Sequence, residues 1–273
     1  MDNNNNDEEG TELRVSNLDQ ENGDQGNILE GMDNVKDDDH YEIQRNLNID
    51  SVYDKSIKVI LLGDSMVGKS SIICRLCKEV FDQSIAPTIS IEYYNYLIKI
   101  NDFTVRMQIW DTAGQEKFNS IIKNYYQNTD FAIFVYSIDN LNSFQRIKDW
   151  MSYAQENNAN SDNREMKNIL LGNKRDLDDS ERKVSHDEGE NFSKNNNFIL
   201  FREISCKNED EDELNNFLGV FDEIAKSCYI DKRRSSTLES DSLSYVASKS
   251  MIDMMEYSQR SKKKKKKKER KCC

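Results

Sequence analysis

Apolar runs and segments with helical periodicity alternate through the middle of the chain. Runs at residues 57–62 and 168–172 predict buried parallel strands, and a third apolar stretch covers 198–201. Residues 103–110 alternate strictly between apolar and polar side chains, which is typical of a half-exposed antiparallel edge strand. Strands that alternate with helices predict an α/β fold, in which helices lie on both faces of a mostly parallel sheet.

Helical periodicity or helix-start signals mark several segments between and after these runs. The first helix is expected to begin at Ser70, and Ser185 with Glu188 has the spacing of a capping box. The acidic residues 209–213 suit the positive end of the dipole of a last helix. Apolar residues that share a helical face are expected to pack in the core: Phe144, Ile147, Met151 and Ala154 in one helix, and Leu214, Phe217, Leu218, Phe221, Ile224, Ala225 and Cys228 in the last.

A glycine-containing loop at 63–70 joins the first strand to the first helix and has the pattern G-x-x-x-x-G-K-S. Strand, loop and helix in this order are the context in which the pattern binds phosphate. Loop amides and the helix N-terminus attract an anion, Lys69 adds a full charge near the β- and γ-phosphates, and the Ser70 hydroxyl can bind Mg²⁺. An ordinary turn is the alternative. The predicted phosphate-binding residues are Ser65, Met66, Val67, Gly68, Lys69, Ser70 and Ser71.

A second polar segment, 173–176, directly follows the strand predicted at 168–172. Loops at the carboxyl ends of parallel strands form the ligand crevice of such folds. The single carboxylate of Asp176 can accept both the N1–H and the 2-amino group of guanine, and adenine would leave that acceptor unpaired. Asn173 belongs to the same segment, and Lys174 can lay its methylene stem over the base. A backbone donor to the guanine carbonyl is expected from Ser205, Cys206 or Lys207.

A third set of residues has the chemistry to sense and hydrolyse a terminal phosphate. Asp111 follows the alternating strand and is placed to hold Mg²⁺ through water. Gly114 has no side chain, so its amide can approach a γ-phosphate closely. Gln115 can orient the attacking water and is the predicted catalytic residue. The Thr88 hydroxyl and carbonyl can complete the Mg²⁺ shell when a γ-phosphate is present.

These three segments resemble the Ras superfamily of small GTPases, and within it the Rab family, over roughly residues 56–228. The runs 110–118 and 88–93 resemble the second and first switch regions of Rab proteins. The resemblance implies a P-loop NTPase fold with a six-stranded, mostly parallel sheet. It also implies that Phe81 stacks on the guanine, and that effectors read an aromatic trio of Tyr93, Trp110 and Tyr125. The chain departs from the family at Met66, where a small residue is usual, and at 127–129.

Charge divides the chain into three expected regions. Residues 1–55 contain 16 Asp/Glu and 4 Lys/Arg, and residues 229–273 contain 14 Lys/Arg and 6 Asp/Glu. The first region is poor in aromatic residues and is expected to be a disordered acidic extension without a signal peptide or myristoylation site. Residues 56–228 are the expected GTPase domain, and 229–273 a basic, disordered tail. The acidic balance of the whole chain argues against nucleic acid as a partner.

The last two residues, Cys272 and Cys273, follow a lysine run at 262–268. A terminal Cys-Cys pair resembles the double-geranylgeranylation signal of Rab proteins, and lipid chains with nearby basic residues together give stable membrane anchoring. A solvated charge run is the alternative. Cys74 and Cys77 have C-x-x-C spacing on the first helix, where packed thiols are expected rather than a zinc or redox site.

The predicted function is a membrane-anchored switch in vesicle trafficking that binds GTP and GDP and hydrolyses GTP slowly. The alternative is a non-hydrolysing, GTP-loaded adaptor, for which Met66 is the only support. The resemblance implies these partners: an exchange factor, a GTPase-activating protein, a prenylation escort, a GDP-dissociation inhibitor and effector proteins. The expected location is the cytoplasmic face of an endomembrane or the plasma membrane, with a cytosolic pool.

Overall fold

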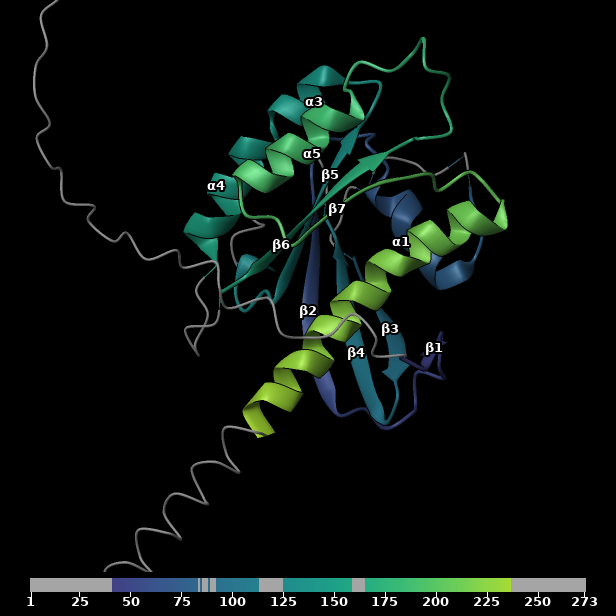
Figure 1. Cartoon of the computed structure of the whole chain (residues 1–273), viewed down its shortest axis with the longest axis vertical. Coiled ribbons are helices and arrows are strands. Elements are labelled where there is room, and N and C mark those ends of the chain that lie inside the picture. The colour runs from purple at the N-terminus through teal and green to yellow at the C-terminus, as the bar shows by residue number, and fades with distance from the viewer. Residues whose placement is uncertain are drawn as a thin grey trace, which may run out of the picture. The chain divides into compact units, whose positions relative to one another are not determined.

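The computed structural model describes residues 41–82, 84, 88, 92–112, 125–158 and 165–236. Within these residues the chain forms an α/β fold around one mixed sheet (Figure 1). Its seven strands lie in the order β1-β3-β4-β2-β5-β6-β7. They are β1 (Ile43–Arg45), β2 (Lys55–Leu62), β3 (Glu92–Ile100), β4 (Phe103–Asp111), β5 (Phe131–Ser137), β6 (Lys167–Asn173) and β7 (Leu200–Ile204).

Parallel pairing joins five of these strands, from β4 through β2, β5 and β6 to β7. The carboxyl ends of these five strands therefore meet at one edge of the sheet, where the loops of a doubly wound fold bind their ligands. β3 is antiparallel to β4 because residues 101–102 form a tight turn between them, and β1 is antiparallel to β3.

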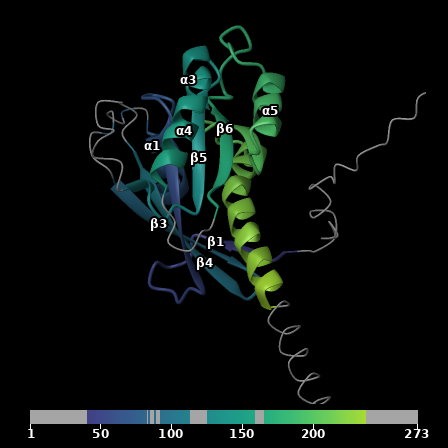
Figure 2. The ribbon, with the colours of Figure 1, turned by 90° about the vertical axis from the view of Figure 1, so that its left-hand side faces the viewer.

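Helices cover both faces of the sheet (Figure 2). On one face, α1 (Lys69–Lys78) and a long helix over residues 211–236 pack on apolar residues of β2, β3 and β4. On the other face lie α3 (Leu141–Gln145), α4 (Ile147–Asn157) and α5 (His186–Asn195). The stripe predicted from Leu214 to Cys228 packs against the first core cluster, and the stripe that contains Ile147 and Ala154 against the second. The predicted capping box of Ser185 and Glu188 is present at α5.

Three sequence predictions about the sheet are wrong. The described residues contain seven strands rather than six, because β1 adds an antiparallel strand to β3. β1 lies within the segment 1–55 that was expected to be disordered, so that prediction fails for residues 41–55. β4 pairs antiparallel with β3 as the alternation indicates, yet β2 pairs with its other side, so β4 is internal rather than an edge strand.

Contacts between the two ends of the described chain hold β1 in place. The guanidinium of Arg45 donates two hydrogen bonds to the Asp222 carboxylate, at 2.9 and 2.6 Å. The ring of Tyr41 meets that of Tyr229 edge-on, with centroids 6.0 Å apart, and Asn101 donates to the Tyr229 hydroxyl at 3.4 Å. We call this set of contacts the clasp. On the long helix, Asp222 lies before residue 228, the boundary expected from the sequence, and Tyr229 lies in the part that continues past it to residue 236.

Candidate functional site

The loop after β2 has a backbone that only certain residues tolerate. Gly63 and Gly68 have φ values of +145° and +100°, and a Cβ on Gly68 would lie 2.1 Å from the Asn173 amide nitrogen. Met66 also has a positive φ, of 67°, although it is not glycine, and its side chain is 70% exposed. The loop therefore turns sharply into the N-terminus of α1, where free N–H groups favour an anion.

Lys69 points back into this loop. Its ammonium donates to the carbonyl oxygens of Gly63 at 2.9 Å and Asp64 at 2.8 Å, and the residue is only 5% exposed. Burial lowers the pKa of Lys69 to about 8, against the attraction of the Asp111 and Asp64 carboxylates. Among the described residues its hydrogen-bond partners are these carbonyls, and a buried ammonium in such surroundings gains stability from an anion at the same place.

Three oxygen-bearing side chains meet next to Lys69. The hydroxyls of Ser70 and Thr88 lie 2.6 Å apart, and each is within hydrogen-bond distance of Oδ2 of Asp111, at 2.7 and 3.1 Å. Within the part of the chain that the structure describes, Oδ1 of Asp111 is buried and has no hydrogen-bond partner. Burial raises the pKa of Asp111, although the bonds from Ser70 and Thr88 and the charge of Lys69 oppose this.

This donor set fits Mg²⁺, which prefers hard oxygen ligands and one or two carboxylates. Ser70 and Thr88 would hold the ion directly, and Asp111 would hold it directly or through water. The structure thus brings together the three predicted metal ligands, which come from α1, from the segment before β3 and from the end of β4.

Asn173 ties the loop to the carboxyl end of β6. Its side-chain nitrogen donates to the carbonyl of Val67 at 2.8 Å, and its oxygen accepts from the thiol of Cys206 at 3.6 Å. Burial raises the pKa of the Cys206 thiol to about 12, so the sulfur stays protonated and can donate. The predicted phosphate and base segments are therefore in direct contact through one buried amide.

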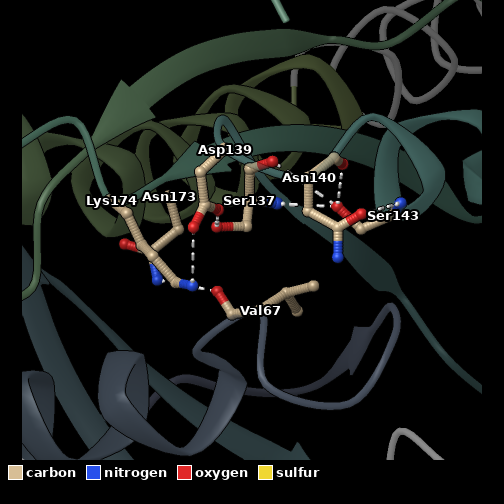
Figure 3. Close-up of polar contacts among 7 residues, drawn as sticks. All are labelled: Val67, Ser137, Asp139, Asn140, Ser143, Asn173 and Lys174. Atoms are coloured by element: carbon tan, nitrogen blue, oxygen red, sulfur yellow. Dashed lines mark hydrogen bonds and ion pairs between the residues drawn. The ribbon is translucent and has the colours of Figure 1, made fainter. Parts of the chain in front are cut away.

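Lys174 lies beside Asn173 and contacts Asp139, which follows the end of β5 (Figure 3). Its ammonium is 3.5 Å from Oδ2 of Asp139, whose other oxygen accepts a short hydrogen bond from Ser137. Partial burial opposes ionisation of Asp139, but the bond from Ser137 and the charge of Lys174 lower its pKa. Lys174 also has a positive φ, of 70°, in the left-handed region.

Asp176 is held by the segment that follows β7. Its Oδ1 accepts from the Ser205 hydroxyl at 2.7 Å, and its Oδ2 lies 3.7 Å from the Lys207 ammonium. The Ser205 oxygen in turn accepts from the backbone N–H groups of Lys207 and Asn208, both at 3.1 Å. Asp176, Ser205 and Lys207 therefore form one group of polar contacts at the edge where β6 and β7 end.

The aromatic trio is also assembled. The rings of Tyr93 and Trp110 stack with centroids 5.2 Å apart, and Tyr125 contacts Trp110 at 5.4 Å. Tyr93 is 56% exposed, so one side of the trio faces solvent. Phe81, which was predicted to stack on guanine, is half-buried and packs against the core cluster beneath α1.

Some predicted residues have fewer contacts or lie outside the described residues. Ser65 and Ser71 are half-buried in the loop and at the start of α1. Gly114, Gln115, Cys272 and Cys273 lie outside the described residues. Cys74 is buried and Cys77 half-buried on α1, and both are free thiols.

Sequence reasoning missed two acidic residues of the site, Asp64 and Asp139. Asp139 follows the apolar run of β5, and the rule that strands deliver polar residues at their carboxyl ends would have found it. Asp64 is part of the loop pattern, but its partner, the indole N–H of Trp150, is 86 residues away in sequence. No local signal connects the two.

A glycine-containing loop with a buried lysine, a cluster of hydroxyl and carboxylate oxygens, and a carboxylate held after β6 lie at one sheet edge, as in nucleotide-binding proteins of the P-loop class. Residues 58–229 match the Ras family, and the chain belongs to it. The chain is 39% identical to the Ras-related protein RABF2a of Arabidopsis thaliana over 170 residues, which are 62% of this chain and 79% of that protein. It is 33% identical to Ras-related protein RABE1e of the same plant over 174 residues, or 64% and 77% of the two chains. Members of this family are small GTPases that bind guanine nucleotides.

Proposed function

We propose that this chain is a Rab-like switch that binds GTP and GDP at a membrane surface and hydrolyses GTP slowly by itself. The observation that carries the proposal is the meeting of the Ser70, Thr88 and Asp111 oxygens beside the buried ammonium of Lys69. Thr88 belongs to a different segment from Ser70 and Asp111. Its position can therefore depend on whether a terminal phosphate is bound, which is the basis of switching in this class of protein.

In the proposed reaction, Lys69 and the amides of the loop hold the β- and γ-phosphates and stabilise charge as the terminal bond breaks. Bound Mg²⁺ would neutralise charge on the phosphate oxygens. Gln115 orients the attacking water, and the amide of Gly114 binds the γ-phosphate. Fast hydrolysis would require an arginine from a GTPase-activating protein.

We propose that Asp176 recognises guanine and that Lys174 covers the base. Both are supported by their positions: Ser205 and Lys207 hold the Asp176 carboxylate, and Asp139 holds the Lys174 ammonium. The segment from Ser205 to Lys207, which is expected to supply a backbone donor to the guanine carbonyl, lies next to Asp176 through these contacts. To stack on the base, the Phe81 ring would either leave the core or contact the base with one face while its edge stays against the core.

A single-turnover assay tests the nucleotide part of this proposal. Protein loaded with GTP and Mg²⁺ is expected to convert it slowly to GDP and phosphate. Gln115→Leu should keep GTP affinity within a few-fold and slow the conversion, most of all when a GTPase-activating protein is added. If wild-type protein holds GTP for hours without producing phosphate, the chain is instead the non-hydrolysing adaptor.

We further propose that geranylgeranyl groups on Cys272 and Cys273, with the lysines 262–268, anchor the protein to the cytoplasmic face of a cellular membrane. No helix among the described residues has the length and apolar character needed to cross a bilayer. Each lipid CH₂ that enters the bilayer contributes about 0.8 kcal/mol, and salt does not screen this term. The lysine attraction is screened within about 8 Å at physiological ionic strength.

Cell fractionation with a high-salt wash tests the anchor. Protein without Cys272 and Cys273 should appear in the supernatant, whereas protein with glutamines at 262–268 should stay with membranes and change its distribution among them. Retention of the double-cysteine variant after the wash would contradict the lipid anchor.

We propose that several partner proteins act on the cycle between the GTP-bound and GDP-bound forms. They are a prenylation escort, a GDP-dissociation inhibitor, an exchange factor and effectors that contact the aromatic trio.

A further inference from the structure

Asp64, the second residue of the phosphate loop, is held from the opposite side of the sheet by the α3–α4 segment. The indole Nε1 of Trp150 donates to Oδ1 of Asp64 at 3.0 Å, and Nε of Arg146 lies 3.5 Å from the same oxygen. The Asp64 side chain is 16% exposed, so few water molecules can replace Trp150 or Arg146 as its partner. A hydrogen bond to a charged acceptor in such a place is stronger than one between neutral groups.

The two partners of Asp64 are themselves fixed. Arg146 separates α3 from α4, since it is the C-cap residue of α3 and the N-cap residue of α4. Trp150 lies one turn later, and its backbone N–H donates to the Arg146 carbonyl at 3.1 Å. Its ring is 4% exposed and packs in the second core cluster with Ile147 and Ala154. The indole N–H is therefore a donor in a fixed position, to which the Asp64 carboxylate of the loop bonds.

The backbone of Asp64 connects this contact to the phosphate site. Its carbonyl accepts from the ammonium of Lys69 at 2.8 Å, while its side chain accepts from Trp150. Rotation of the Asp64 peptide would therefore disturb both bonds. On the other side of the loop, Asn173 holds the carbonyl of Val67. Side chains therefore hold the loop on both sides: Trp150 and Arg146 from the α3–α4 segment, and Asn173 from β6.

We propose that Trp150 is a positioning residue for phosphate binding, which acts through Asp64 on the loop and on Lys69. The inference rests on the proposed function, since it concerns how the same site holds its nucleotide. Trp150 touches no reacting atom. It restricts a loop whose Met66 is already in the left-handed region, and a loop that stays in place loses less freedom when phosphate binds. A movement of the α3–α4 segment would therefore shift Asp64 and change how tightly the loop holds the nucleotide.

Release of a fluorescent GDP from the full chain with Mg²⁺ tests this proposal. Trp150→Phe keeps an aromatic ring and removes the N–H, and should release GDP about tenfold faster. Asp64→Ala should have a similar or larger effect. The double variant should release GDP at nearly the rate of Asp64→Ala alone, because both changes break the same bond. Asp64→Asn, whose amide oxygen can still accept from Trp150, should release GDP more slowly than Asp64→Ala.

Tyr136→Phe is the matched control, because it also removes a polar atom from a buried aromatic ring of the same core cluster. The Tyr136 hydroxyl has no hydrogen-bond partner among the described residues, so GDP release should stay at the wild-type rate. If the Trp150 and Asp64 effects multiply in the double variant, Trp150 has only a general structural role and the proposal is overturned. Wild-type release from Trp150→Phe would overturn it as well. Failure of the wild-type protein to retain any GDP would instead reject the proposed function.

Discussion

The two ends of the sheet handle charge in opposite ways. Among the described residues at the edge where β2, β4 and β6 end, the Lys69 ammonium donates to backbone carbonyls alone, and one oxygen of Asp111 has no hydrogen-bond partner. At the far end, the Arg45 guanidinium and the Asp222 carboxylate satisfy each other with two hydrogen bonds. Both places bury charge in the same domain.

This difference in charge pairing distinguishes residues that bind a ligand from residues that stabilise the fold. Charges left with incomplete partners cost free energy until a ligand supplies the missing ones, so they indicate a site. Breaking a charge pair that joins distant segments destabilises the fold, because the remaining charge is left buried without a partner. Changes at the first edge should therefore alter nucleotide binding with little effect on unfolding, and changes in the clasp should do the reverse. The following variants test that contrast, from the largest expected effect to the smallest.

Asp176→Asn is expected to reduce the preference for GTP over XTP by about 10⁴-fold, because a site built around a hydrogen bond strongly rejects a ligand that cannot make it. An amide cannot accept both donors of guanine but can donate to the 2-carbonyl of xanthine. A competition assay with both nucleotides measures the preference. Asp139→Asn is the control, since it removes a carboxylate from the same edge and should weaken both nucleotides alike. A preference that stays unchanged in Asp176→Asn would refute the base-binding assignment.

Arg45→Met should lower the free energy of unfolding by about 3 kcal/mol, because it leaves the Asp222 carboxylate buried without its partner. The Asp222 side chain is 7% exposed, whereas that of Arg45 is 33% exposed. Asp222→Leu should therefore cost less, since water can still reach the guanidinium that remains. Urea unfolding at saturating GDP measures both values. Equal losses in the two variants, or GDP release faster than wild type in either, would contradict the separation of the two ends.

Nucleotide affinity should fall as pH rises above about 8, the pKa to which burial lowers Lys69. Below this pH the ammonium is present in the free protein, and above it binding must take up a proton. A tenfold weaker affinity for GDP is expected for about one pH unit beyond the pKa. Calorimetry in two buffers of different ionisation enthalpy at pH 8.5 should detect the proton uptake. A flat affinity between pH 7 and 9 would show that the ammonium is not required.

The free energy of unfolding without nucleotide depends on pH with the opposite sign. The folded-state pKa of Lys69 lies below its ordinary value of 10.5. The unfolded chain therefore binds the extra proton between about pH 8 and 10.5, and the contribution of Lys69 to stability rises with pH across that window. Binding and folding thus respond to the same group in opposite directions, which a pH series of unfolding with and without GDP would separate.

Much of the site could be predicted from the sequence because it depends on short segments. The loop at 63–70, the pair Asn173 and Asp176, and the capping box at Ser185 each act through neighbours in the chain or through the rule that parallel strands end at one edge. The same rule predicts that Ser70 and Asp111 lie near each other, and the structure places their side-chain oxygens 2.7 Å apart.

The failures come from contacts that no local pattern encodes. The alternation along 103–110 correctly indicated an antiparallel neighbour, but it could not show that β2 would pair with the other side of the strand. The composition of residues 1–55 predicts disorder as an average, and it hides the short strand β1. This strand pairs with β3, and its Arg45 meets Asp222 across 177 residues. The bond between Trp150 and Asp64 is equally non-local.

The clasp has a practical consequence for where this protein can be cut. The family match begins at residue 58, and a shortened version designed on that boundary would lack Tyr41, Arg45 and all of β1. It would expose backbone donors and acceptors along Ile98–Ile100, which invites strand pairing between molecules. It would also leave Asp222 unpaired on a helix that the family match includes. A fragment that starts at or before residue 41 keeps these groups covered and is the better starting point for biochemical work.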